Sequence, residues 1–203
     1  MEMRKPSRGR PRSFDEDAVL DAVMRAFWEH GYEGTSVATL EAATGLKAPS
    51  LYGAFGSKEL LYQTALERYA CEHGTVLRPD GPAREAVSEF LNEAADRFSE
   101  SGLPPGCMVS TAALALGATQ RGVATRPARM RSETLAGIEQ RLWTAVTEGE
   151  LPGGTDVGAL ARLFGAVIQG MSVQAIDGAT RQELRGLAAV AMAAWPSRGG
   201  ADR

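Results

Sequence analysis

The segment from residue 35 to residue 60 constrains the fold more than any other part of this chain. Its pattern predicts a helix capped by Ser36, a tight turn at Gly45, a short second helix, and a longer helix capped by Ser57. Pro49 is compatible with the short helix because it lies in the first turn, where backbone N–H groups have no helical partners. Two short helices that meet at a glycine turn are typical of the helix-turn-helix, whose second helix enters the DNA major groove.

Apolar residues recur at three- and four-residue spacing along most of the chain, and no segment has the alternating pattern of a convincing strand. We therefore expect an all-α fold of about nine helices. The sixth helix contains no charged residue, so it is expected to be buried. The expected helices cover residues 15–30, 36–44, 48–54, 57–73, 83–101, 107–120, 126–148, 156–177 and 181–195.

The distribution of charge along the chain is uneven. The 203 residues carry a formal net charge of −3. Residues 1–14 hold five basic residues and one acid, a charge of +4, so the rest of the chain carries −7. A basic arm on an acidic body fits a protein that touches phosphate at one end only. The alternative interpretation of the arm is a solubilising disordered tail.

Cysteine content and the N-terminal composition indicate a compartment. Cys71 and Cys107 are too few for a disulfide framework, so a reducing cytoplasm is expected. The chain begins with basic and polar residues rather than an apolar signal segment, so secretion is not expected. The longest uncharged helical stretch, 163–176, is shorter than a membrane span, and no membrane partner is expected.

Three motifs carry a resemblance to a known family. They are Gly31-Tyr32-Glu33-Gly34-Thr35-Ser36, Ala43-Thr44-Gly45-Leu46, and Ser50-Leu51-Tyr52-Gly53-Ala54-Phe55-Gly56-Ser57-Lys58-Glu59-Leu60. In order and spacing these motifs resemble the TetR family of one-component bacterial regulators. The resemblance implies a three-helix DNA-binding domain that contains the helix-turn-helix, followed by a helical domain for effector binding and dimerisation.

The resemblance also implies a domain organisation and a mode of action. We expect a flexible basic arm (1–13), a DNA-binding domain (14–60), an effector-binding and dimerisation domain (61–195) and a disordered tail (196–203), with the helix 57–73 shared by both domains. A homodimer is expected because two recognition helices must meet half-sites about one DNA turn apart, which makes the operator palindromic. Family members commonly act as repressors that leave the double-stranded operator when a small molecule binds and the fourth helix moves.

Nine residues are candidate DNA contacts. Ser50 and Tyr52 suit the N-terminal end of a recognition helix, where short polar or flat groups reach bases and phosphates. Lys58 resembles the phosphate clamp of the family. In the alternative interpretation Tyr52 lies half in the core and Lys58 is merely solvated. The remaining candidates are another phosphate-binding lysine, two residues at the start of the preceding helix and three arginines of the arm, namely Lys47, Thr35, Ser36, Arg8, Arg10 and Arg12.

Two positions depart from the pattern of the family. Lys47 stands where Ser or Thr usually caps the recognition helix, and a lysine side chain cannot accept a capping bond. Gly53 stands where the family often has His or another contacting side chain, which implies fewer base contacts or a close approach of the backbone to DNA.

Apolar helical faces supply the candidates for two further sites, and each could equally be simple core. The terminal helix pair gives the dimer candidates Leu160, Phe164, Val167, Ile168, Met171, Leu184, Leu187, Val190 and Ala191. The helices before that pair give the ligand candidates Phe90, Phe98, Met108, Leu114, Met130, Trp143 and Gln169. The apolar character of the sixth and eighth helices favours an apolar or weakly polar small molecule over a polyanion.

Two rival interpretations come from other classes of chemistry. An enzyme is disfavoured because His30 and His73 are isolated and no nucleotide-binding or nucleophile motif is present, so neither a metal nor a cofactor is expected. Cys107 follows Pro104-Pro105-Gly106 at an expected helix N-terminus, which can lower the pKa of a thiol. It is either a redox-sensing thiol or a buried small hydrophobe.

Overall fold

The structure, a computed structural model, describes residues 14–114, 116 and 120–197. Within these ranges it contains nine helices and no strand, and the all-α prediction is confirmed. The helices are α1 (Glu16–Gly34), α2 (Val37–Thr44), α3 (Ala48–Phe55), α4 (Lys58–His73), α5 (Ala83–Phe98), α6 (Met108–Thr111), α7 (Arg121–Thr147), α8 (Val157–Ile176) and α9 (Arg181–Met192).

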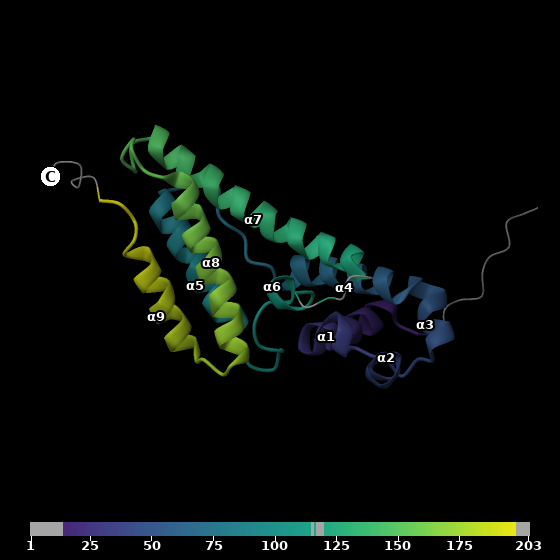
Figure 1. Cartoon of the computed structure of the whole chain (residues 1–203). Helices are drawn as coiled ribbons and strands as arrows, with labels where there is room; N and C mark the ends of the chain where they lie inside the picture. Colours follow the sequence, from purple (N-terminus) through teal and green to yellow (C-terminus); the bar gives the residue numbers. More distant parts are fainter. Residues whose placement is uncertain (1–13, 115, 117–119, 198–203) are drawn as a thin grey trace, which may run out of the picture.

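The helices form two packed groups at opposite ends of an elongated molecule (Figure 1). One group consists of α1 to α4 and buries Phe27, Leu40 and Leu51 in its core. The other consists of α5, α8, α9 and much of α7, and its core includes Phe164 and Met171. All the buried side chains of α4 belong to the N-terminal core, so packing joins this helix to α1, α2 and α3.

Local capping sets the ends of the helix-turn-helix. The Ser36 hydroxyl accepts the N–H of Thr39 at 3.0 Å, and the Ser57 hydroxyl accepts the N–H of Leu60 at 3.2 Å. Gly45 ends α2 in the left-handed conformation with a φ of 69°, which glycine adopts without steric cost. The order of helix, turn and helix therefore follows directly from short-range signals in the chain.

The recognition helix α3 is capped by a residue of the preceding helix. Lys47 makes no side-chain capping bond. One carboxylate oxygen of Glu41 instead accepts the N–H of Ala48 at 2.8 Å, and the other accepts a bond from the Lys47 ammonium at 3.0 Å. The bond from the Ala48 N–H, followed by the bond from Lys47, lowers the pKa of the Glu41 carboxyl. Glu41 thereby replaces the missing cap and ties α2 to α3.

A kink at Gly31 places the DNA-binding group against α6. Gly31 has a φ of 68° within α1, and the N–H of Tyr32 donates to the carbonyl of Ala112 at 2.9 Å. A Cβ atom on Gly31 would lie only 3.2 Å from that carbonyl oxygen. Both the positive φ and the close approach of α6 therefore favour glycine here.

The sixth and seventh helices differ from the prediction. The helix expected over 107–120 is the short α6, and the Ala112 carbonyl accepts the bond from Tyr32 in α1 where a longer helix would use it internally. The seventh helix begins at Arg121 rather than Arg126, although Pro127 lies inside it. Val123 is buried in the N-terminal core, and this packing stabilises the added turn.

The helix α8 has almost the bounds predicted from the sequence, 156–177, and extends beyond the uncharged stretch 163–176 because it includes Arg162. It spans 20 residues and is long and apolar enough, by length and composition alone, to cross a membrane. Core helices of soluble proteins meet the same criterion. The packing of α8 against α5, α7 and α9, with Phe164 and Met171 fully enclosed, is that of a core helix.

Candidate nucleic-acid interface and ligand cavity

The exposed side of α3 is small and polar. Leu51 is completely buried and anchors the helix, whereas Lys47, Ser50 and Gly53 are exposed. A Cβ atom built on Gly53 would meet nothing within 4 Å, so space in front of this position is open. The surface can approach a flat partner closely and offers a hydroxyl and an ammonium group to it.

The two residues predicted at the start of α2 have opposite environments. Thr35 is completely buried, and its hydroxyl donates to the carbonyls of Gly31 at 2.6 Å and Ala26 at 3.2 Å. Its backbone N–H also donates to Gly31. The assignment of Thr35 as a DNA contact was therefore wrong, because its polar groups hold the α1–α2 corner. Ser36 is exposed and caps α2.

Tyr52 and Lys58 are less free than a surface site requires. Tyr52 is half-buried, and its hydroxyl is enclosed without a hydrogen-bond partner among the described residues. A phosphate contact through that hydroxyl is therefore not available in this conformation, and the ring edge is what remains. The Lys58 ammonium lies 4.5 Å from the centre of the Tyr32 ring, and burial lowers its pKa against the opposing effect of Glu33.

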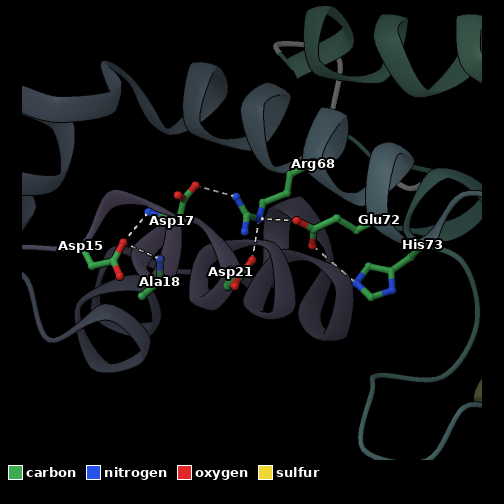
Figure 2. A network of polar contacts seen from close by, with 7 residues as sticks. All are labelled: Asp15, Asp17, Ala18, Asp21, Arg68, Glu72 and His73. Atoms are coloured by element: carbon green, nitrogen blue, oxygen red, sulfur yellow. Dashed lines mark hydrogen bonds and ion pairs between the residues drawn. The ribbon is translucent and has the colours of Figure 1, made fainter.

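Two acidic residues of α1, Asp17 and Asp21, are directed toward α4. Figure 2 shows the Arg68 guanidinium of α4 among Asp17 and Asp21 of α1 and Glu72 of its own helix. Its Nη1 lies 3.0 Å from a carboxylate oxygen of Asp17, and its Nε lies 3.1 Å from one of Glu72. The ion pairs join α1 to α4 and partly neutralise the acids close to the DNA-binding end. The predicted arm contacts Arg8, Arg10 and Arg12 lie outside the described residues.

A cavity of about 780 Å³ lies among α4, α5, α7, α8 and the segment 107–110. Four of the predicted ligand residues line it, namely Phe90, Phe98, Met130 and Gln169. The other three were wrong. Met108 is completely buried in the N-terminal core. Leu114, which precedes α7, is 62% exposed, and Trp143 of α7 is 51% exposed. Helical periodicity identified apolar positions but not which of them face the cavity.

The charged side chains of the cavity were not predicted from the sequence. Arg126 and Arg131 of α7 and Arg162 of α8 line it. Their spacing along the two helices does not reveal which side faces the cavity, because that depends on how the helices are oriented in the fold. His73 of α4 also lines the cavity, and burial lowers the pKa of its imidazole.

Aromatic rings connect the cavity to the DNA-binding group. Tyr69 and His73 line the cavity, and Trp28 of α1 contacts both, with ring centroids 4.7 Å and 5.2 Å apart. The indole N–H of Trp28 donates to the carbonyl of Gly106 at 3.2 Å. The next residue, Cys107, donates its N–H to the Ser172 hydroxyl of α8 at 2.8 Å. The wall of the cavity is therefore in direct contact with α1.

Cys107 lies partly buried on the cavity wall. The helix that follows it has only four residues, so the macrodipole on which the thiol-sensor interpretation depended is small. Burial, followed by the neighbouring Cys107 thiol, raises the pKa of the Tyr69 hydroxyl.

Most of the predicted dimer residues face inward. Phe164, Met171 and Leu184 are completely buried in the core of their own protomer, so they offer no surface to a partner in this conformation, and Leu160, Ile168 and Ala191 are also largely buried in that core. Val167 and Leu187 are partly buried, and Val190 is 71% exposed. The large apolar residues that α8 presents to solvent are Leu163, Val173 and Ile176.

Comparisons with known proteins agree with this geometry. Residues 19–65 match the bacterial regulatory proteins of the tetR family, and residues 83–190 match the tetracyclin repressor-like C-terminal domain. The HTH-type transcriptional repressor ComR of Escherichia coli strain K12 is 36% identical over 197 residues, which cover 95% of this chain and 94% of ComR. The HTH-type transcriptional repressor BdcR of the same strain is 40% identical over 115 residues, which cover 54% of this chain and 58% of BdcR.

A solved structure extends the likeness to a DNA complex. It holds a triple cysteine mutant of the TetR family transcriptional regulator CifR with 26 bp double-strand operator DNA. Its TM-score is 0.87 at 39% identity, and the match covers 93% of this chain and 100% of that chain. The fold and the exposed helix-turn-helix define a DNA-binding transcriptional regulator rather than an enzyme. More particularly, the chain belongs to the TetR family of bacterial regulatory proteins.

Proposed function

We propose that this protein is a homodimeric repressor that binds a palindromic operator and leaves it when a small molecule occupies the cavity. The observation that carries this proposal is the contact between the cavity wall and α1. Tyr69 and His73 line the cavity, and both pack on Trp28. A ligand that displaces these rings moves α1 and α4 together, since the Arg68 ion pairs join the two helices.

Release requires that the ligand discriminate between two states. A ligand lowers DNA affinity only by its differential affinity for the free and the operator-bound conformations. Movement of α4 relative to α8 changes the distance between the two recognition helices of the dimer, and a palindrome with fixed half-site spacing then binds less well.

The DNA contacts that we propose lie on α3 and at two helix starts. Ser50 and Lys47 are exposed on or beside α3, and the exposed positions Pro49 and Gly53 allow a close approach to the groove. Ser36 lies at the N-terminus of α2, where free N–H groups favour a phosphate. Secondary contacts come from Lys58, from the ring edge of Tyr52, and from the arm residues Arg8, Arg10 and Arg12.

The dimer interface that we propose is the exposed face of α8 and α9. Leu163, Val173 and Val190 present apolar surface to solvent there, and covering it favours association. Cβ atoms built on Gly170 and Gly186 would meet nothing within 4 Å, so both positions leave room for a partner helix. We place the protein in the cytoplasm, where operator DNA is accessible.

The experiment that tests this function begins with selection of bound sequences from a random DNA library by the purified full chain. We expect one palindrome to be enriched. Placed between a promoter and a reporter, this palindrome should reduce expression only when the protein is present, and a scrambled palindrome should not. Failure to enrich a palindrome, or a reporter that ignores the protein, would contradict the proposal.

A further inference from the structure

The cavity has an apolar side and a cationic side. Phe90 and Phe98 of α5, with Leu135 of α7 and Ile168 of α8, supply apolar surface. The guanidinium-bearing residues Arg126, Arg131 and Arg162 line the same space from α7 and α8. A purely apolar molecule would leave the arginines of this cavity without a partner, and a small inorganic ion would leave its apolar side uncovered.

The positive charge of the cavity is not balanced by its own acids. Glu133 is the one acid among the described lining residues, and its carboxylate pairs at 2.8 Å with the Nε of Arg129, which lies outside the lining. Arg126 has Glu67 at 3.9 Å, and both side chains are well exposed, so this pair is weak. Burial lowers the pKa of His73, which therefore adds little positive charge at neutral pH.

Arg131 is held in position for recognition of an anion. Its Nη1 donates to the carbonyl of Val109 at 2.6 Å, and Val109 itself lines the cavity. This bond restrains the guanidinium while the remaining N–H groups stay available, and the planar fork of arginine matches carboxylate and phosphate oxygens. Arg162 faces the same space from α8.

We propose that the effector is an amphipathic anion, with an apolar body against the phenylalanines and a carboxylate or phosphate at Arg131 and Arg162. The volume of about 780 Å³ lies within the range of about 300–1,000 Å³ typical of small-molecule sites. This assignment replaces the expectation of an apolar or weakly polar effector, which overlooked Arg162 in the eighth helix. It rests on the proposed function only in identifying the cavity as the effector site.

The first test measures binding of small probes to the purified full chain, without DNA, by isothermal titration calorimetry. Octanoate, octyl phosphate and octanol share one apolar chain and differ in the head group. At least one of the two anions should bind at least about tenfold more tightly than octanol, a difference of about 1.4 kcal/mol. The anion with the higher affinity identifies the head group. Octanol binding as tightly as both anions would overturn the proposal.

Variants separate a specific site from general charge attraction. Arg162→Gln removes a cavity charge, and the matched control Arg84→Gln removes an exposed charge of α5 outside the cavity. We expect Arg162→Gln to weaken anion binding about tenfold while octanol binding is unchanged. Arg131→Lys retains the positive charge but loses the planar guanidinium, so it should weaken anion binding less than Arg162→Gln does. Unchanged anion affinity in Arg162→Gln, or an equal loss in Arg84→Gln, would overturn the assignment.

The outcome for the effector class is distinguishable from the outcome for the proposed function. If the anion binds as described and operator affinity does not fall, then release by ligand is contradicted while the anion site stands. If the operator is bound specifically and no anion preference exists, then the repressor assignment stands and the effector class is wrong.

Discussion

At the residue scale, Thr35 and Ser36 illustrate how neighbouring hydroxyls differ in role. The buried Thr35 hydroxyl donates to two backbone carbonyls, so Thr35→Val should lower the free energy of unfolding by about 1–2 kcal/mol. The folded variant should bind operator DNA with unchanged affinity because the hydroxyl does not reach the surface. Urea denaturation and fluorescence anisotropy measure the two effects.

Ser36→Ala is the matched comparison for Thr35→Val. Loss of the α2 cap should cost about 1 kcal/mol of stability, and operator affinity should fall as well. If fully folded Thr35→Val instead binds operator DNA more weakly than the wild type, that hydroxyl lies in the DNA interface.

The Glu41 carboxylate gives a prediction for pH dependence. Its pKa is lower in the folded chain than the ordinary value of 4.5, so its stabilising effect is present above pH 4.5 and is lost as the pH falls through the lower folded pKa. Glu41→Gln should therefore lower the Tm at pH 7, and the difference from the wild type should shrink below pH 4. Thermal denaturation by circular dichroism at both pH values tests this. A difference in Tm that is independent of pH would contradict the role of the ionised carboxylate.

At the element scale, Gly53 tests how closely α3 approaches DNA. A Cβ at position 53 meets nothing in the free protein, so Gly53→Ala should raise stability by about 0.5–1 kcal/mol through helix propensity. The added methyl group should at the same time reduce operator affinity, because it stands on the proposed groove-facing side. Denaturation and anisotropy together measure this opposite pair of effects.

Gly45→Ala is the control for Gly53→Ala in the same motif. Its φ of 69° is unfavourable for alanine, so stability should fall by about 1 kcal/mol. If Gly53→Ala loses stability as Gly45→Ala does, the open space in front of Gly53 is not real.

The elements of the helix-turn-helix could be predicted from the sequence because their signals are local. Ser36, Gly45 and Ser57 act within three or four residues of the chain. The cap on α3 could not be predicted, because Glu41 belongs to another helix. The end of α6 also depends on a distant group, the N–H of Tyr32.

Helix faces were harder to predict than helix positions. Helix α8 is apolar on two sides, one with Phe164 in the protomer core and one with Leu163 and Val173 at the surface. The predicted dimer residues of α8 came mainly from the side with Phe164, since the sequence does not reveal which neighbour covers which side. The cavity residues Arg131 and Arg162 were missed for the same reason.

At the scale of the whole molecule, the exposed face of α8 and α9 determines assembly. Val190 is 71% exposed, so Val190→Glu places a charge on the proposed interface without disturbing the core of the protomer. We expect this variant to be monomeric and to bind operator at least about tenfold more weakly. Analytical ultracentrifugation and anisotropy measure both properties. Leu114→Glu, at a position 62% exposed on another surface, should remain dimeric. A dimeric Val190→Glu would place the interface elsewhere.

Repression by this protein depends on sequence-specific binding of its dimer to an operator. The most direct measurement is a titration of the full chain against the selected palindrome, with excess random DNA as competitor and at two salt concentrations. We expect saturation at two protomers per palindrome and binding that survives the competitor, with an affinity that falls as salt rises. Binding that the competitor abolishes, or saturation without a defined stoichiometry, would contradict it.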